Sequence, residues 1–256
     1  MVKINIPETP LVSIIMNCYN CEKFLREAID SVYAQTYDNW EIIFWDNAST
    51  DNSLEIAKSY DSKLKSYHVN ELSPLYTARN MALEHVKGKV VAFLDCDDIW
   101  LNDKLERQIV EYLSGYKFVY GGYEIIDSKG QSTGNIEEDN QSGHLTSKIL
   151  KKNLISIGSV LIDVELLKQN KFDPVYDLLG DFDLWIRLSV KTEISSVEGI
   201  VELSRQHGEN TSLCLKNNWL KERRYFYKKF LVLFSVFRYP YIFLYIIKTE
   251  LKGLIK

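Results

Sequence analysis

The chain has few of the residues that define several common protein classes. Its 256 residues include only four cysteines, five prolines and twelve glycines, and its formal net charge is −4. Four cysteines are too few for a disulfide-rich secreted scaffold. The low proline and glycine content excludes a collagen-like or low-complexity chain. The acidic charge balance argues against a nucleic-acid-binding surface, so no nucleic-acid partner is expected.

Several motifs for binding phosphates and metals are also missing. The sequence contains neither G-x-G-x-x-G nor the P-loop pattern, so it lacks the glycine-rich cradles of dinucleotide and P-loop proteins. No H-E-x-x-H is present, and the four histidines are scattered, which argues against a multi-histidine zinc site.

The remaining composition is typical of a folded protein with an unusual C-terminal end. Hydrophobic residues make up 46% and charged residues 26% of the chain. Residues 215–256 carry ten lysines and arginines against two acids, although the chain as a whole is acidic. The N-terminal residues show no small-residue cleavage site, so we expect no secretory signal and a reducing, cytoplasmic location.

Apolar runs alternate with helical patterns, which predicts an α/β fold with a mostly parallel sheet flanked by helices. The expected strands are 11–16, 40–45, 65–69, 89–94, 117–127 and 155–162. The expected helices are 22–35, 52–60, 77–86, 104–113, 181–190 and 213–229. Residues 128–143 are expected to form a long polar loop, and no linker separates the two halves.

Cys18 and Cys21 form a C-Y-N-C motif between a strand and a helix. Such a pair can carry thiol redox chemistry or contribute to a zinc site. The sequence offers no second ligand pair with suitable spacing and no other redox feature. We therefore favour the interpretation that they are small neutral residues near a strand end.

Acidic residues follow two of the expected strands. Asp95, Asp97 and Asp98 come directly after strand 89–94, and ligands of open parallel sheets bind at the carboxyl ends of strands. Clustered carboxylates suit Mg²⁺ or Mn²⁺, although acids at this point could also complement the dipole of the next helix. Asp46 ends strand 40–45 and could accept hydrogen bonds from a base or ribose, or initiate a turn.

Two further polar segments lie in the second half. Asp181 and Asp183 open an expected helix, where one could cap the helix while the other faces a cleft. Arg205 could meet a phosphate, and His207 could bind a metal as a neutral imidazole or be structural.

Taken in order, six segments resemble the family-2 glycosyltransferases, which are inverting enzymes with the GT-A fold. The likeness covers residues 11–212. The segments are VSIIMNCYN (12–20), QTYDNWEIIFWDNASTDNS (35–53), ARN (78–80), FLDCDD (93–98), GDFDLWIRL (180–188) and RQHGENTS (205–212).

The resemblance implies a role for each matching residue. Asp181 corresponds to the catalytic base, with Asp183 as a second choice, and Asp97 and His207 correspond to the metal site. Contacts to the donor or acceptor sugar are implied for Asp98, Trp185 and Arg205. Contacts to the nucleotide sugar are implied for Asn17, Tyr19, Asp46, Arg79 and Asp95.

Some positions depart from the family pattern. Asn17 replaces the usual proline, Asn47 replaces a frequent aspartate, and Ser73-Pro74 stands where glycine is often found. Gly180 replaces the glutamate that usually precedes the base, which removes a charge beside Asp181.

The resemblance implies an inverting glycosyltransferase that uses Mn²⁺ or Mg²⁺ to move a sugar from a nucleotide donor, with UDP favoured, to a glycan or polyprenyl-linked acceptor. Residues 1–212 would form the enzyme domain, with a nucleotide-binding half (1–103) and an acceptor half (104–212). The alternatives are a nucleotidyltransferase, although the glycine- and lysine-rich loop it needs is missing, and a non-catalytic nucleotide-sugar or glycan binding subunit.

The C-terminal tail (213–256) is expected to be helical, basic and aromatic. Arg238 and Pro240 interrupt its apolar stretch, which disfavours a membrane-spanning helix. Residues 221–256 suit peripheral contact with the anionic inner face of the plasma membrane. The alternative is a helix that packs on the core or forms a dimer interface; the sequence does not indicate an oligomeric state.

Overall fold

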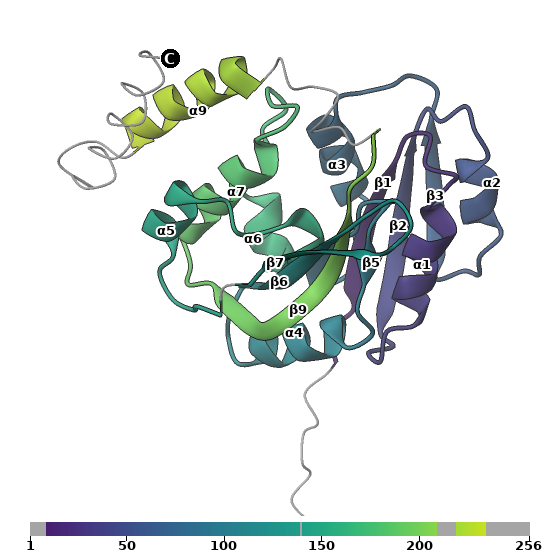
Figure 1. Ribbon diagram of the computed structural model, residues 1–256, viewed down its shortest axis with the longest axis horizontal. Helices are drawn as coiled ribbons and strands as arrows, with labels where there is room; N and C mark the ends of the chain where they lie inside the picture. The colour runs from purple at the N-terminus through teal and green to yellow at the C-terminus, as the bar shows by residue number, and fades with distance from the viewer. Residues whose placement is uncertain (1–8, 139, 209–218, 234–256) are drawn as a thin grey trace, which may run out of the picture.

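The computed structural model describes residues 9–138, 140–208 and 219–233, and its strands join in one nine-stranded sheet (Figure 1). The strand order is β3-β2-β1-β4-β8-β6-β9-β5, with β7 paired to β6. The strands are β1 (Val12–Cys18), β2 (Trp40–Asn47), β3 (Leu64–Val69), β4 (Val90–Phe93), β5 (Ile99–Trp100), β6 (Phe118–Ile126), β7 (Ser132–Glu137), β8 (Leu161–Asp163) and β9 (Ser195–Arg205).

Helices cover both faces of the sheet. They are α1 (Leu25–Tyr33), α2 (Ser53–Lys58), α3 (Leu75–Leu83), α4 (Lys104–Leu113), α5 (Thr146–Lys151), α6 (Val164–Lys168), α7 (Gly180–Ser189) and α9 (Trp219–Leu233), with a 3₁₀ turn at Ile157–Ser159. Buried residues of α1, α2 and α4 form one hydrophobic cluster, and those of α3, α5, α6, α7 and α9 form the other. The molecule therefore has three layers, as predicted for an α/β fold.

The first four expected strands are confirmed, and they lie side by side in the sheet. β3, β2, β1 and β4 are parallel neighbours. In β1, Ile14 and Met16 belong to one cluster and Ile15 to the other, because successive side chains of a strand point to opposite faces. A strand buried on both faces is mostly apolar, and such runs are easily recognised in a sequence, which is why this half was predicted well.

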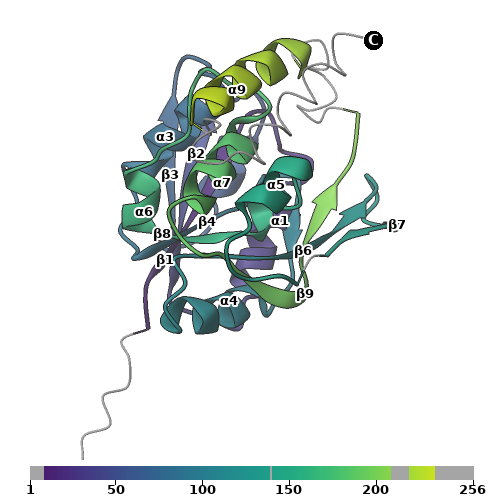
Figure 2. The ribbon, with the colours of Figure 1, turned by 90° about the vertical axis from the view of Figure 1, so that its left-hand side faces the viewer.

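The second half differs from the prediction in several places. Helices α5 and α6 were not predicted. Residues 155–162, expected as one strand, contain the 3₁₀ turn and only the start of β8. The polar loop 128–143 contains β7, which pairs with β6 and stands out at the side of the sheet (Figure 2). β9 was missed because Gly199, at φ +76°, breaks its apolar pattern where its pairing with β6 shifts register.

α9 is the part of the tail that the structure describes, and it packs on the protein. Phe226 and Phe230 are buried in the core cluster on the α7 side of the sheet, and Figure 2 shows α9 lying over α7. The buried Glu222 carboxylate accepts N–H bonds from Asp177, Leu178 and Leu179, just before α7. For residues 219–233, the alternative of a helix packed on the core is thus the correct one.

The remaining tail residues, 234–256, lie outside the described part of the chain, as do 213–218 at the start of the predicted helix. Among the described helices, none combines the length and the apolar character that a membrane span requires.

Candidate functional site

A cavity of about 650 Å³ opens at the carboxyl ends of the parallel strands. The loops after β1 and β4 and the end of β2 line one part of it, while α3 with the segment before it, the loop before α7 and the end of β9 line the rest. The structure brings most of the predicted site residues to this cavity. They are Asn17, Tyr19, Arg79, Asp95, Asp97, Asp98, Asp181, Arg205 and His207.

A buried arginine lies among the acids. Arg79, on α3, is 3% exposed, and its Nη2 donates to Asp95 Oδ1 at 2.7 Å. Its guanidinium also lies over the rings of Tyr76 and Phe172. Since a buried cation needs a charged partner, Arg79 and Asp95 hold each other in place and put a positive charge in the cavity wall.

Asp97, in the loop after β4, lies next to His207, which follows β9. His207 Nε2 and Asp97 Oδ2 are 2.8 Å apart. Burial and the nearby charge of Asp95 raise the pKa of the Asp97 carboxyl. A carboxylate oxygen and an imidazole nitrogen at this separation are donors that Mn²⁺ accepts, so these two residues fit the predicted metal site.

Asp181 and Asp183 have different surroundings. Asp181 lines the cavity and accepts hydrogen bonds from its own neighbour, Phe182 N–H, at 2.7 Å and from Tyr76 Oη at 3.3 Å. Burial raises the pKa of Asp181, and the charge of Arg79 partly offsets this. Asp183 is fully buried away from the cavity, where it pairs with Arg187 and Lys229. Of the two acids, Asp181 is therefore the one that can meet a ligand.

Gly180 is packed against the ring of Tyr76. A Cβ added at Gly180 would lie 2.5 Å from two carbons of that ring, which is 2% exposed. Glycine in place of the usual glutamate at this position thus has a structural reason, because the Tyr76 ring fills the space beside Asp181 and its hydroxyl contacts the Asp181 carboxylate.

Asp98 and Arg205 line the cavity but already have partners inside the protein. Asp98 Oδ1 accepts the Arg205 N–H at 2.7 Å, and burial raises the pKa of Asp98 well above its ordinary range. Arg205 Nη2 pairs with Glu27 at 2.6 Å, and its Nε donates to the Asp97 carbonyl. Both side chains therefore hold β9 to the acidic loop.

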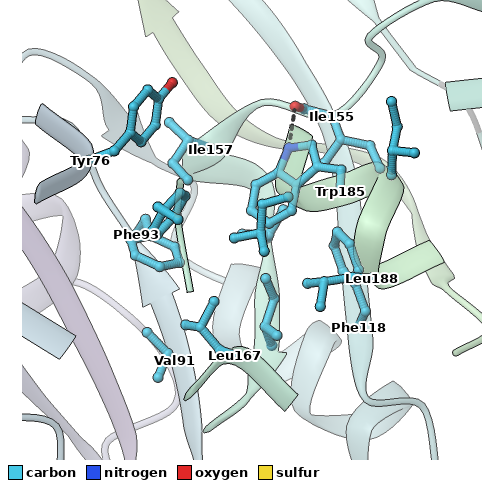
Figure 3. Packing of buried hydrophobic residues seen from close by; sticks show 14 of the residues in the cluster. Tyr76, Val91, Phe93, Phe118, Ile155, Ile157, Leu167, Trp185 and Leu188 are labelled. Atoms are coloured by element: carbon cyan, nitrogen blue, oxygen red, sulfur yellow. Dashed lines mark hydrogen bonds between the residues drawn. The ribbon is translucent and has the colours of Figure 1, made fainter. Parts of the chain in front are cut away.

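Two predicted site residues do not line the cavity. Trp185 is fully buried, packs on Phe118 and donates from its indole Nε1 to the Ile155 carbonyl (Figure 3). Its predicted contact with a sugar is wrong for this structure, because helical spacing places it on the core face of α7. Asp46 is also fully buried, pairs with His68 at 2.7 Å and accepts the Ser49 N–H. It organises the turn after β2, which was the alternative interpretation.

The sequence patterns did not identify the position of Tyr76 or the contacts of Asn47. Tyr76 precedes Arg79 by one helical turn, a spacing that puts both on the same face of α3 and could have indicated its position. Asn47 holds the segment before α3 through hydrogen bonds to the backbone and hydroxyl of Ser73. This long-range contact has no signal in the sequence.

Comparison with known proteins agrees with this architecture. The model of the family described as "Glycosyl transferase family 2" matches residues 13–162. A β-1,3-glucosyltransferase of Escherichia coli, WfgD, is 36% identical over 189 residues, which cover 73% of each chain. WfgD is described as transferring glucose from UDP-Glc to α-D-GlcNAc-diphosphoundecaprenol. TuaG of Bacillus subtilis, a putative teichuronic acid biosynthesis glycosyltransferase, is 33% identical over 187 residues, or 71% of this chain and 73% of TuaG.

Other relatives are longer. An uncharacterized glycosyltransferase of Rickettsia felis is 34% identical over 219 residues, and the match spans 82% of this chain but 36% of that protein. Among solved structures, S. aureus TarS (1–349) in complex with UDP-GlcNAc matches with a TM-score of 0.70 at 20% identity, covering 86% of this chain and 66% of that one. The predicted GT-A-type fold is thereby confirmed.

Proposed function

Because the chain belongs to glycosyl transferase family 2, we propose that it is an inverting transferase that moves a sugar from a nucleotide donor to a hydroxyl of a cell-surface glycan or its lipid-linked precursor. The observation that carries the proposal is the convergence of Arg79, Asp95, Asp97, Asp181 and His207 on one cavity. Relatives that take part in cell-surface polysaccharide synthesis support the choice of acceptor.

In this proposal Asp181 is the general base. Its carboxylate takes the proton of the acceptor hydroxyl as that oxygen attacks the anomeric carbon, and one displacement from the opposite face inverts the configuration. The raised pKa of Asp181 brings it closer to a working base near neutral pH. The Tyr76 hydroxyl, which lies 3.3 Å from the Asp181 carboxylate and 3.2 Å from the Leu178 carbonyl, helps to position the carboxylate.

The donor side has its own residues. Arg79 places positive charge in the cavity wall, and Asp97 and His207 would hold a divalent cation. Such a cation, when bound, neutralises charge on the diphosphate leaving group. The side-chain Oδ1 and Nδ2 of Asn17 have no hydrogen-bond partner among the described residues, which supports a donor contact there because buried polar groups are rarely left unpaired.

Nucleotide specificity is tested by thermal melting with UDP, GDP, CDP or dTDP, each with and without Mn²⁺. We expect UDP to stabilise the protein only when the metal is present, by about 2.7 kcal/mol at a hundredfold excess over Kd. The metal-dependent part should vanish in Asp97→Asn. No shift with any nucleotide would contradict donor binding and favour the glycan-binding alternative.

We also propose that the tail beyond α9 contacts the inner face of the plasma membrane. Residues 234–256 continue the basic and aromatic pattern of the tail, and a lipid-linked acceptor, as WfgD is described to use, lies at that surface.

Removing residues 234–256 is expected to move the protein from the membrane fraction to the supernatant on fractionation. This cut keeps Phe226 and Phe230, which are buried in the core, and the melting temperature of the truncated chain is measured to verify that it folds. Unchanged partitioning would refute membrane contact by the tail.

A further inference from the structure

Three cysteines from separate segments converge at the wall of the cavity. Cys18 ends β1, Cys21 lies in the turn before α1, and Cys96 stands between Asp95 and Asp97 in the loop after β4. Their Sγ atoms all lie within 4.8 Å of one another. All three are free thiols that line the cavity, and none of them has a role in the transfer reaction proposed above.

The fold explains why the three thiols meet. β1 and β4 are parallel neighbours, so their carboxyl ends bring Cys18 and Cys96 to the same edge of the sheet. Between Cys18 and Cys21, Asn20 adopts a left-handed conformation, with φ at 55°, in the turn that joins the two cysteines. The Cys21 N–H donates to Ser53 Oγ at 2.9 Å and thereby fixes the third thiol.

We infer that Cys18, Cys21 and Cys96 form a binding site for a thiophilic metal ion of the Zn²⁺ class. Thiolates select such ions over Mg²⁺, which prefers oxygen ligands. Around a tetrahedral zinc, with Zn–S bonds of about 2.3 Å, two sulfurs lie about 3.8 Å apart. The observed upper limit of 4.8 Å therefore requires a closure of no more than about 1 Å for any pair.

The site would be open on one side. Three protein ligands leave a fourth position, and because all three cysteines line the cavity, a water molecule or a ligand can occupy it. Cys96 is flanked by Asp95 and Asp97, so a metal held here also fixes the acidic loop. This site is distinct from the one formed by Asp97 and His207, which offers oxygen and nitrogen donors.

The test uses the full chain, reduced and stripped of metal with a chelator, and titrated with Co²⁺ in the absence of oxygen. We expect a thiolate-to-cobalt charge-transfer band that saturates at one equivalent and disappears when Zn²⁺ is added. Zn²⁺ should also protect three thiols from alkylation and raise the melting temperature. If cobalt titration of the wild-type protein gives no charge-transfer band, the site is excluded and no variant is needed to overturn the inference.

Variants identify the ligands. Cys21→Ser and Cys96→Ser should each weaken cobalt binding at least about tenfold, in line with loss of a metal ligand. Cys214, the fourth cysteine of the chain, lies outside the described residues, and Cys214→Ser is the matched control that should keep the band. Asp97→Asn, which removes no thiol, should keep it as well. A band that survives in both Cys21→Ser and Cys96→Ser would overturn the assignment, and a band lost in Cys214→Ser would overturn the three-ligand site.

Discussion

Replacing Asp181 by asparagine is expected to lower kcat by about 10²–10⁴-fold, because the amide cannot accept the proton of the acceptor hydroxyl. Asparagine has nearly the same shape and can still accept the Tyr76 hydroxyl and the Phe182 N–H. Nucleotide affinity should therefore stay close to the wild-type value. Steady-state kinetics together with nucleotide binding by calorimetry measure both quantities, and near-normal turnover would refute the assignment.

The pH profile gives a second measure of the same group. A general base acts only when deprotonated, so kcat/KM of the wild type should fall as the pH drops through the pKa of Asp181. Burial raises that pKa, which places the acid limb above the range of an ordinary aspartate, about 3.9. In Tyr76→Phe the limb should move to still higher pH, because the hydroxyl that stabilises the carboxylate is gone.

Asp183→Asn is the discriminating control. Asp183 is fully buried and pairs with Arg187 and Lys229, each at 2.7 Å, so loss of its charge leaves two cations with a weakened partner. We expect a loss of stability of about 3 kcal/mol, seen on denaturant unfolding, while the folded fraction keeps its turnover. If instead Asp183→Asn lost its turnover and Asp181→Asn kept it, Asp183 would be the base.

The second large effect is expected at Gly180. Gly180→Ala puts a methyl group 2.5 Å from the Tyr76 ring, which is buried and packed on Phe172, so the ring must move. Overpacking of this kind costs about 1–3 kcal/mol. Since Tyr76 also holds Asp181, kcat should fall by up to about 10²-fold, the effect of a small misplacement at a reacting group. Unfolding curves and steady-state kinetics measure the two losses.

A double-mutant cycle separates this clash from a general intolerance of alanine. Tyr76→Ala removes the ring, so adding Gly180→Ala to it should cost much less stability than Gly180→Ala does in the wild type. Gly208→Ala serves as a control, because a Cβ there meets no atom of the described residues within 4 Å. Additive losses in the cycle would show that the Tyr76 ring does not limit the space at Gly180.

By itself, the sequence determined the family, the three-layer fold and the identity of the acids at the strand ends. β1, β2 and β4 are mostly apolar because both of their faces are buried, and the acids at their carboxyl ends must lie at one edge because the strands are parallel. Apolar runs followed by acids are local patterns, so they can be recognised in a sequence without any knowledge of distant contacts.

Only the tertiary structure decided what each polar group does. The structure places Asp181 at the cavity and Asp183 in the interior. It shows that Trp185 and Asp46 are buried, and that Cys96 lies beside the C-Y-N-C pair. It also showed that Tyr76 occupies the space beside Gly180. The physical reason is that a side chain's role depends on burial and on partners far away in the sequence, such as Lys229 for Asp183, and neither quantity is encoded in a local pattern of residues.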